Sequence, residues 1–338
     1  MEQPIAIVVL NWNGLEVTLD CLEALKEQTY TNLEIHLVDN GSMVSEKEAL
    51  RGHVTKADNI VFYDNPKNLG FAKGVNQVLK KLVKSGKFEF VALLNNDTVP
   101  DKNWIAALLN AAKNRGLDMV ASKQLFYENP QVIDNAGLTL LSTTEVLPIG
   151  AREYSKDFEA SFECLCPSAG AGLYKLKVFE EVGFFSTKFK TCYEDAELGL
   201  RAALAGFKCG FEPNAKVKHR VSYSVNRIKK SDYGITLQYN MLITYFGLMP
   251  KRFKIIHGWK AVLRSLMLMA LGVLTFRGNL IKSQVFGWQR FLKDKKALKS
   301  SEVKLSNQEI EQLHTPILKL YFKYLKQFIF SGKPTVLE

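Results

Sequence analysis

Short apolar runs in the first hundred residues alternate with segments of helical periodicity. Four runs rich in aliphatic and β-branched residues are predicted strands: Ile5–Leu10, Glu34–Val38, Ile60–Tyr63 and Phe90–Leu94. Between the first two, apolar residues spaced three and four apart predict one buried helix face: Leu15, Leu19, Leu22 and Leu25. This alternation predicts an α/β fold with a mixed, mainly parallel sheet flanked by helices.

The pattern changes along the chain. A further helix is predicted from Glu194 to Ala205, where Gly206 is a typical C-terminal stop. Beyond about Val225, long segments that mix apolar and basic residues replace the β/α pattern. We therefore predict one α/β domain over residues 1–225 and a helical C-terminal region over residues 226–338.

Charge distinguishes the two regions further. The net charge is +11, but residues 226–338 contain 20 Lys and Arg against 6 Asp and Glu, so the preceding part is slightly acidic. Basic charge beside apolar helices predicts an anionic partner, either lipid or nucleic acid. The longest nearly uncharged apolar stretch, Ser265–Phe276, is shorter than the roughly 18 residues that span a bilayer. We expect this region to lie on a membrane surface or to pack within the protein.

The N-terminus and the cysteines bear on the compartment. Residues Met1–Leu10 lack a basic start and a small-residue cleavage site, so Ile5–Leu10 is predicted to be a strand and not a secretion signal. The five cysteines are scattered and contain no C-x-x-C pair, which favours a reducing compartment. We expect a cytoplasmic protein.

Polar residues follow three predicted strands where they end. They are Asn11–Gly14, Asp39–Ser42 and Asn95–Asp97. Ligands bind at the carboxyl ends of parallel strands, so these residues are candidate ligand contacts. Asp97 offers one carboxylate, which suffices for Mg²⁺ or Mn²⁺ when phosphates and water complete the shell. An Asn/Asp turn without a ligand explains the same residues equally well.

Six segments in a fixed order carry a family resemblance. They are IVVLNWNG (Ile7–Gly14), VDNGS (Val38–Ser42), NPKNLGFAKGVN (Asn65–Asn76), LLNNDTVP (Leu93–Pro100), GFFSTKFKTCYEDAELGLRAALAGF (Gly183–Phe207) and NAKVKH (Asn214–His219). In this order the chain resembles the family 2 glycosyltransferases with a GT-A fold, especially the bacterial rhamnosyltransferase-like branch. The resemblance covers most of residues 5–225. It implies a donor half over about residues 1–100 and an acceptor half over about residues 101–225.

The resemblance assigns a donor site. Asp39 would accept a hydrogen bond from the pyrimidine of a nucleotide sugar, with Asn11 and Asn40 near the nucleoside. The predicted nucleotide-sugar contacts are Asn11, Asn13, Asp39, Asn40, Gly70, Lys73, Asn76, Asn95 and Asn96. Gly70 and Lys73 begin a predicted helix, whose free amides attract anions, although Lys73 is equally consistent with a surface lysine.

The resemblance also assigns a metal site and a catalytic base. Asp97 would hold Mg²⁺ or Mn²⁺ as the last carboxylate of the family's D-x-D motif, although Asn95 stands where the first Asp is common. His219 is the second predicted metal ligand. Asp195 would take the proton of the acceptor hydroxyl, and Glu194 would hold the acceptor or orient the base, although acidic residues also favour helix N-termini for electrostatic reasons. Glu197 is expected to pair with Arg201.

These expectations define the predicted function. The chain would be an inverting, metal-dependent glycosyltransferase of bacterial cell-surface polysaccharide synthesis, with dTDP-L-rhamnose as the first donor and UDP-galactose, UDP-glucose or UDP-N-acetylglucosamine as the alternative. The acceptor would be a glycan or a lipid-linked saccharide, and the enzyme would bind the inner face of the cytoplasmic membrane peripherally. A dehydrogenase is excluded because the first strand is not followed by G-x-G-x-x-G. We expect no nucleic-acid partner, although a basic nucleic-acid-binding protein or a catalytically silent scaffold are the non-enzyme alternatives.

Overall fold

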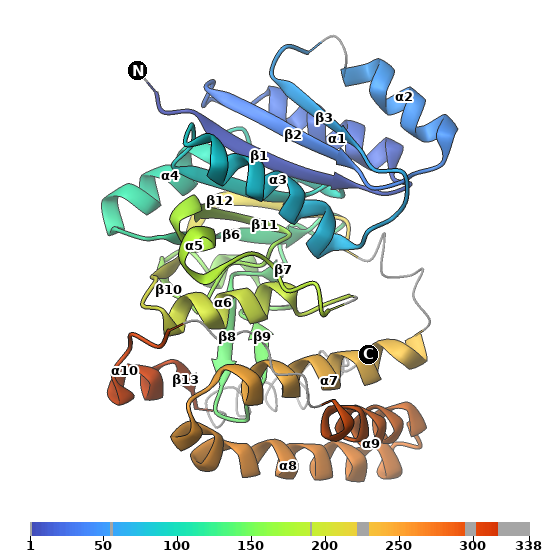
Figure 1. Ribbon diagram of the computed structural model, residues 1–338, viewed down its shortest axis with the longest axis vertical. Helices are drawn as coiled ribbons and strands as arrows, with labels where there is room; N and C mark the ends of the chain where they lie inside the picture. The colour runs from blue at the N-terminus through green and yellow to red at the C-terminus, as the bar shows by residue number, and fades with distance from the viewer. Residues whose placement is uncertain (1, 55–56, 190, 222–229, 295–301, 317–338) are drawn as a thin grey trace. The chain divides into compact units, whose positions relative to one another are not determined.

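A computed structural model describes residues 2–54, 57–189, 191–221, 230–294 and 302–316 (Figure 1). The chain forms two compact units. The first comprises Met1–Leu138 and Pro148–Val221, and the second comprises Thr139–Leu147 and Ser222–Glu338. The boundary predicted at residues 225 and 226 lies outside the described residues.

A ten-stranded sheet forms the first unit, with the strand path β10-β12-β6-β11-β4-β1-β2-β3, to which β5 and β7 add at β12 and β6. Its strands are β1 (Ile5–Asn11), β2 (Leu33–Asp39), β3 (Ile60–Asp64), β4 (Phe90–Asn95), β5 (Thr98–Pro100), β6 (Met119–Phe126), β7 (Ile133–Asn135), β10 (Phe162–Glu163), β11 (Ala171–Lys175) and β12 (Cys209–His219). The core pairs β1–β2, β1–β4, β2–β3 and β6–β12 are parallel, and β11 runs antiparallel between β4 and β6. The predicted mixed, mainly parallel sheet is confirmed.

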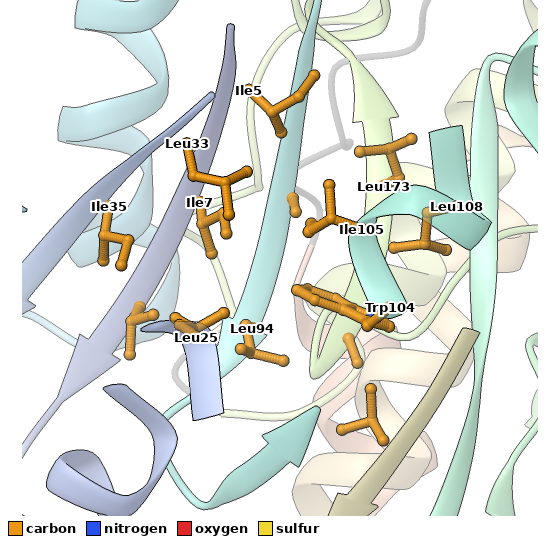
Figure 2. Packing of buried hydrophobic residues seen from close by; sticks show 14 of the residues in the cluster. Ile5, Ile7, Leu25, Leu33, Ile35, Leu94, Trp104, Ile105, Leu108 and Leu173 are labelled. Atoms are coloured by element: carbon orange, nitrogen blue, oxygen red, sulfur yellow. The ribbon is translucent and has the colours of Figure 1, made fainter. Parts of the chain in front are cut away.

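Helices cover both faces of this sheet (Figure 1). They are α1 (Leu15–Lys26), α2 (Val44–Val54), α3 (Phe71–Ser85), α4 (Trp104–Arg115), α5 (Leu176–Val182) and α6 (Glu194–Leu204), with a short 3-10 helix at Ser155–Asp157. Side chains alternate along β1: Ile5 and Ile7 share a core with α1, α2 and α4, whereas Ala6 and Val8 share one with α3, α5 and α6. Figure 2 shows the first of these cores, in which Trp104 is completely buried. Burying such side chains contributes about 1.5–3 kcal/mol each, so both faces stabilise the sheet.

The described part of the second unit contains four helices and a small sheet. The elements are α7 (Lys230–Leu248), α8 (Lys251–Leu274), α9 (Gly278–Lys293), α10 (Asn307–Gln312), β8 (Leu138–Leu141), β9 (Val146–Pro148) and β13 (His314–Thr315). The three strands follow the order β13-β8-β9. The helical C-terminal region is confirmed. The hairpin β8–β9, which carries a segment of the middle of the chain into this unit, was not predicted.

Helix α8 differs from its sequence-based expectation. The uncharged run at Ser265–Phe276 is too short to span a bilayer, but the helix that contains it begins at Lys251. Among the described residues, α8 is the one helix long and apolar enough to cross a membrane by length and composition.

Candidate active site

The ends of β1 and β2 form one hydrogen-bonded group of polar side chains. Parallel pairing sets Asn11 opposite Asp39. The Asn11 Nδ2 donates to Asp39 Oδ2 at 2.9 Å, and the backbone N–H of Ser42 donates to Asp39 Oδ1 at 3.0 Å. Both oxygens of the buried Asp39 thus have fixed directions, which fits a carboxylate that must be held in one orientation.

The turn after β2 requires a glycine. Gly41 has φ +78°, and a Cβ there would lie 2.3 Å from the Lys67 carbonyl carbon. This close approach brings the 65–69 segment against Asn40, whose Oδ1 accepts from Asn65 Nδ2 at 3.0 Å and from the Leu69 N–H at 3.2 Å. Asn40 therefore joins the ends of β2 and β3.

The remaining predicted asparagines are held by internal bonds. Asn13 Oδ1 accepts from the Met43 N–H at 2.8 Å, and Asn96 Nδ2 donates to Thr18 Oγ1 at 2.9 Å. Asn76 exchanges two hydrogen bonds with the backbone of Phe185, at 2.8 and 3.1 Å. Asn13 and Asn96 thus lie beside the β1–β2 group, whereas Asn76 anchors the segment that leads into α6.

The beginning of α3 lies next to this group. Gly70, with φ +78°, precedes the helix, and its N–H donates to Asn68 Oδ1 at 2.8 Å. Lys73 is exposed in the first turn. An exposed cation beside helix-start amides provides a suitable environment for a phosphate group.

Asp97, His219 and Asp134 form a second cluster, supplied by the turn after β4 and by the strands β12 and β7. His219 Nδ1 donates to Asp134 Oδ2 at 2.8 Å, and its Nε2 lies 3.3 Å from Asp97 Oδ1. That approach does not have hydrogen-bond geometry, so the buried Asp97 Oδ1 has no hydrogen-bond partner. Burial alone would lower the pKa of His219, but hydrogen bonding to Asp134 and contact with Asp97 raise it to about 10.

This cluster fits a divalent cation. The Asp97 Oδ1, which has no hydrogen bond, and the His219 Nε2 face each other at 3.3 Å, and both are ligand types that Mn²⁺ accepts once the cation displaces the imidazole proton. Asp134 holds the far ring nitrogen, as carboxylates commonly do behind metal-bound histidines. Sequence reasoning missed Asp134, because it stands alone in the short edge strand β7 and no motif marks it.

A tight backbone turn positions Asp195. Cys192 and Tyr193 both have positive φ, 57° and 74°, directly before α6. The Ala196 N–H donates to Asp195 Oδ1 at 2.8 Å, and the Ala169 N–H donates to Oδ2 at 3.3 Å. Burial raises the pKa of Asp195 and outweighs these donors, which lower it. The carboxylate is therefore a stronger proton acceptor than an ordinary surface Asp.

The turn Ser168–Gly170 connects the Asp195 carboxylate to the end of β4. Ala169 donates to Asp195, while the Gly170 carbonyl accepts from the Asn95 N–H at 2.8 Å. A Cβ at Gly170 would lie 3.2 Å from Asn95 Nδ2 and 3.3 Å from Gln124 Oε1. This turn brings together Asn95, Asp195 and Gln124, and no sequence motif pointed to Gln124.

Glu197 and Arg201 form the predicted pair. Arg201 Nε donates to Glu197 Oε1 at 2.6 Å and Nη2 donates to Oε2 at 2.7 Å, and both side chains are buried. Arg201 also donates to the carbonyls of Val182 and Phe184. The pair therefore holds the segment before α6 in place, as expected for a structural role.

The burial of Glu194 should make the stability of the protein depend on pH. Desolvation raises its pKa to about 7, so the folded protein binds a proton there between about pH 4.5 and 7 that the unfolded chain releases. The associated stability is present below pH 4.5 and is lost as the pH rises through 7. We expect Glu194→Gln to be more stable than the wild type at pH 8 by on the order of 1–3 kcal/mol, with a smaller difference at pH 4.5. Urea denaturation at both pH values measures this, and an equal difference at both would contradict it.

In the second unit, His257, Glu311 and His314 come close enough to share an ion. The two imidazole rings stack, however, with centroids 4.1 Å apart and an interplanar angle of 17°, and their nitrogens already have partners within the unit. His314 bonds to the Ile310 carbonyl and to Tyr245, and Lys260 contacts His257. Burial, followed by the neighbouring His257, lowers the pKa of His314 to about 4. We assign this cluster to packing.

Parts of this chain are similar in sequence to known glycosyltransferases. The family model described as Glycosyl transferase family 2 matches residues 6–183, which is more than half of the chain. The O-antigen biosynthesis protein RfbC of Myxococcus xanthus is 25% identical over 233 residues, covering 64% of this chain and 17% of the relative. Glycosyltransferase GlyG of Streptococcus pneumoniae serotype 4 is 27% identical over 128 residues, covering 38% and 41%. The chain thus spans less than half the length of these curated relatives.

Solved structures share the fold at low identity. The mannosyltransferase PcManGT from Pyrobaculum calidifontis, in complex with GDP-Man and Mn²⁺, matches with a TM-score of 0.55 at 15% identity and covers 88% of this chain and 89% of that one. GalNAc-T7 with UDP, GalNAc and Mn²⁺ matches with a TM-score of 0.59 at 15% identity, covering 75% and 49%. These likenesses establish the GT-A fold. Because the family model covers more than half of the sequence, this chain belongs to the family 2 glycosyltransferases.

Proposed function

We propose that this protein is an inverting glycosyltransferase that acts in cell-surface glycan synthesis. One observation carries the proposal: the turn Ser168–Gly170 joins the candidate base Asp195 to the end of β4, two residues from Asp97. A proton acceptor and a candidate metal ligand thus serve one rim of the sheet. Family membership and the O-antigen relative support the same activity.

Asp97 and His219 would hold the divalent cation, and Asp134 would orient His219 from behind. Mn²⁺ is present in the structures of PcManGT and GalNAc-T7, which supports Mn²⁺ or Mg²⁺ here. When bound, the cation would stabilise negative charge on the departing diphosphate. With a single Asp in place of the D-x-D pair, His219 would supply the second protein ligand.

The donor would bind across the ends of β1, β2 and the start of α3. Asp39, oriented by Asn11 and Ser42, would accept a hydrogen bond from the pyrimidine ring. The helix-start amides after Gly70 and the side chain of Lys73 would attract the diphosphate. We propose dTDP-L-rhamnose as the donor, with a UDP-hexose as the alternative.

Asp195 would take the proton of the acceptor hydroxyl as its oxygen attacks the anomeric carbon from the side opposite the diphosphate. Such a single displacement inverts the anomeric centre. The raised pKa of Asp195 favours proton capture, and the two backbone donors keep its carboxylate in one orientation. Glu194 would contact the acceptor, which we propose to be a glycan or a lipid-linked saccharide.

A thermal-shift series with nucleotide sugars tests this function. A donor that binds only the folded state raises the melting temperature. At a donor concentration a hundred times the dissociation constant, the gain in the free energy of unfolding is about 2.7 kcal/mol. We expect dTDP-rhamnose with Mn²⁺ to give the largest shift and the same sugar with EDTA to give a small one. A larger shift with a UDP-hexose would replace the donor, and no shift with any nucleotide sugar would contradict the function.

A further inference from the structure

Helix α8 presents a broad apolar face to solvent. Its exposed apolar side chains, at least 36% accessible, are Ile255, Ile256, Trp259, Val262, Leu263, Leu266, Met267, Leu271, Val273 and Leu274. At 100° per residue these positions fall on one side of the helix. Phe276, in the turn that follows, is 96% exposed, and Phe286 on α9 is also exposed. This set, which we call the α8 face, exceeds the scattered apolar exposure of ordinary protein surfaces.

The opposite side of α8 is packed and polar. Gly258 and Gly272 allow close approach of Phe246 on α7 and Ile281 on α9, respectively. Ser265 Oγ accepts from Trp288 Nε1 at 2.9 Å, and Arg264 lies 3.5 Å from the buried Glu145. The helix is therefore half packed, with hydrogen-bonding and charged groups behind it that would be costly to carry into hydrocarbon.

The segment that carries the α8 face has basic charge only. Residues 251–293, which comprise α8, the turn and α9, contain nine Lys and Arg and no Asp or Glu. Lys251 and Arg252 are exposed at the start of α8, and Lys282 is exposed on α9. The apolar centre and the basic surroundings together have the composition of helices that lie in a membrane interface.

We propose that the α8 face docks in the plane of an anionic lipid bilayer, with its apolar side chains among the acyl chains and the surrounding Lys and Arg at the headgroups. A second copy of this chain is a poor occupant, because it would bring the same positive charge against itself. Nucleic acid is a poor occupant because the centre of the face is aliphatic and presents no basic stripe to a phosphate backbone. The proposal is independent of the reaction and holds whichever sugar is transferred.

Flotation of the full chain with vesicles tests this proposal. We expect the protein to bind phosphatidylcholine vesicles that contain about 30% phosphatidylglycerol. At low salt this binding should exceed binding to pure phosphatidylcholine vesicles at least tenfold. Val262→Glu/Leu266→Glu should reduce binding at least tenfold. Lys251→Gln/Arg252→Gln/Lys282→Gln should remove the preference for anionic vesicles. The matched control is Val61→Glu, an exposed apolar position on β3 of the first unit, which should bind like the wild type.

The proposal is overturned if the wild type does not float with the vesicles or binds neutral vesicles equally well. It is also overturned if the Val262→Glu/Leu266→Glu variant binds as well as the wild type. Retention in the membrane after alkaline carbonate washing would indicate a spanning helix and would contradict the proposal too. A dimer that this variant dissociates, or tight binding to duplex DNA, would also overturn it if vesicle binding is absent. If the double variant fails to fold, quenching by brominated lipids decides instead. We expect quenching of the wild type that Trp259→Phe removes, and quenching that Trp259→Phe leaves unchanged would contradict the docked orientation.

Discussion

Replacing Asp195 by Asn should lower sugar transfer by about a hundred- to ten-thousand-fold, the usual cost of losing a general base. Asn keeps the size of the side chain, and its one amide oxygen can still accept from the nearer of the two donors, the Ala196 N–H, so α6 should remain in place. The donor group at β1 and β2 is untouched, and binding of donor and metal should stay within about twofold of the wild type. Single-turnover transfer and calorimetric donor titration measure the two quantities separately.

Glu16→Gln is the matched control for this variant. Glu16 lies in the first turn of α1, as Asp195 lies in the first turn of α6, and it serves only as a helix-start carboxylate. The Glu16→Gln substitution should leave the rate of sugar transfer unchanged. NMR of the product should show inversion at the anomeric carbon. Near-normal transfer by a folded Asp195→Asn protein would move the base to another residue, with Glu194 the next candidate, and a retained configuration would exclude single displacement.

Asp97→Ala should abolish turnover and the Mn²⁺-dependent part of nucleotide binding. The turn after β4 then offers no carboxylate, and His219 alone cannot hold the cation against water. Asp134→Asn should have an intermediate effect, with Mn²⁺ affinity reduced about 10- to 100-fold, because the imidazole loses the carboxylate that orients it. Electron paramagnetic resonance of Mn²⁺ with and without nucleoside diphosphate measures both affinities independently of turnover.

Asp64→Asn provides the corresponding control. Asp64 also ends a strand at the same edge of the sheet, but it pairs with Lys47 and Arg51 at the surface. The Mn²⁺ affinity of the Asp64→Asn variant should equal that of the wild type. Normal Mn²⁺ binding by Asp97→Ala would refute the metal assignment, and normal binding by Asp134→Asn would show that Asp134 has no part in orienting His219.

The sequence predicted the elements of residues 1–100 well because its information is local. Each of the four predicted strands exists, and each ends one residue later than predicted, in the polar residues Asn11, Asp39, Asp64 and Asn95, while β2 also begins one residue earlier. Apolar composition ends one residue before backbone pairing does, because the last paired residue already faces the ligand edge. Extending each predicted strand to the polar residue that follows it gives the correct C-terminal end.

What the sequence could not supply is pairing between distant segments. Asp134 reaches His219 only because β7 pairs with β6, which in turn pairs with β12. Gln124 and Asn95 both lie beside Gly170 only because β11 pairs with β6 on one side and with β4 on the other. The β8–β9 hairpin joins the second unit although it lies between segments of the first. None of these arrangements has a signature within a single stretch of sequence.

The turn Ser168–Gly170 has a consequence for how acceptor preference can diversify. It fixes the candidate base Asp195 relative to the strand that ends beside the candidate metal ligand, through one hydrogen bond on each side and a glycine at which a Cβ would fit only tightly. If Asp195 is the base, its spacing from the end of β4 is thereby set by the main chain and not by the side chains that would select the acceptor. Substitutions around this turn can then change which hydroxyl is accepted while the chemistry stays in register, whereas an insertion or deletion within it would separate the two.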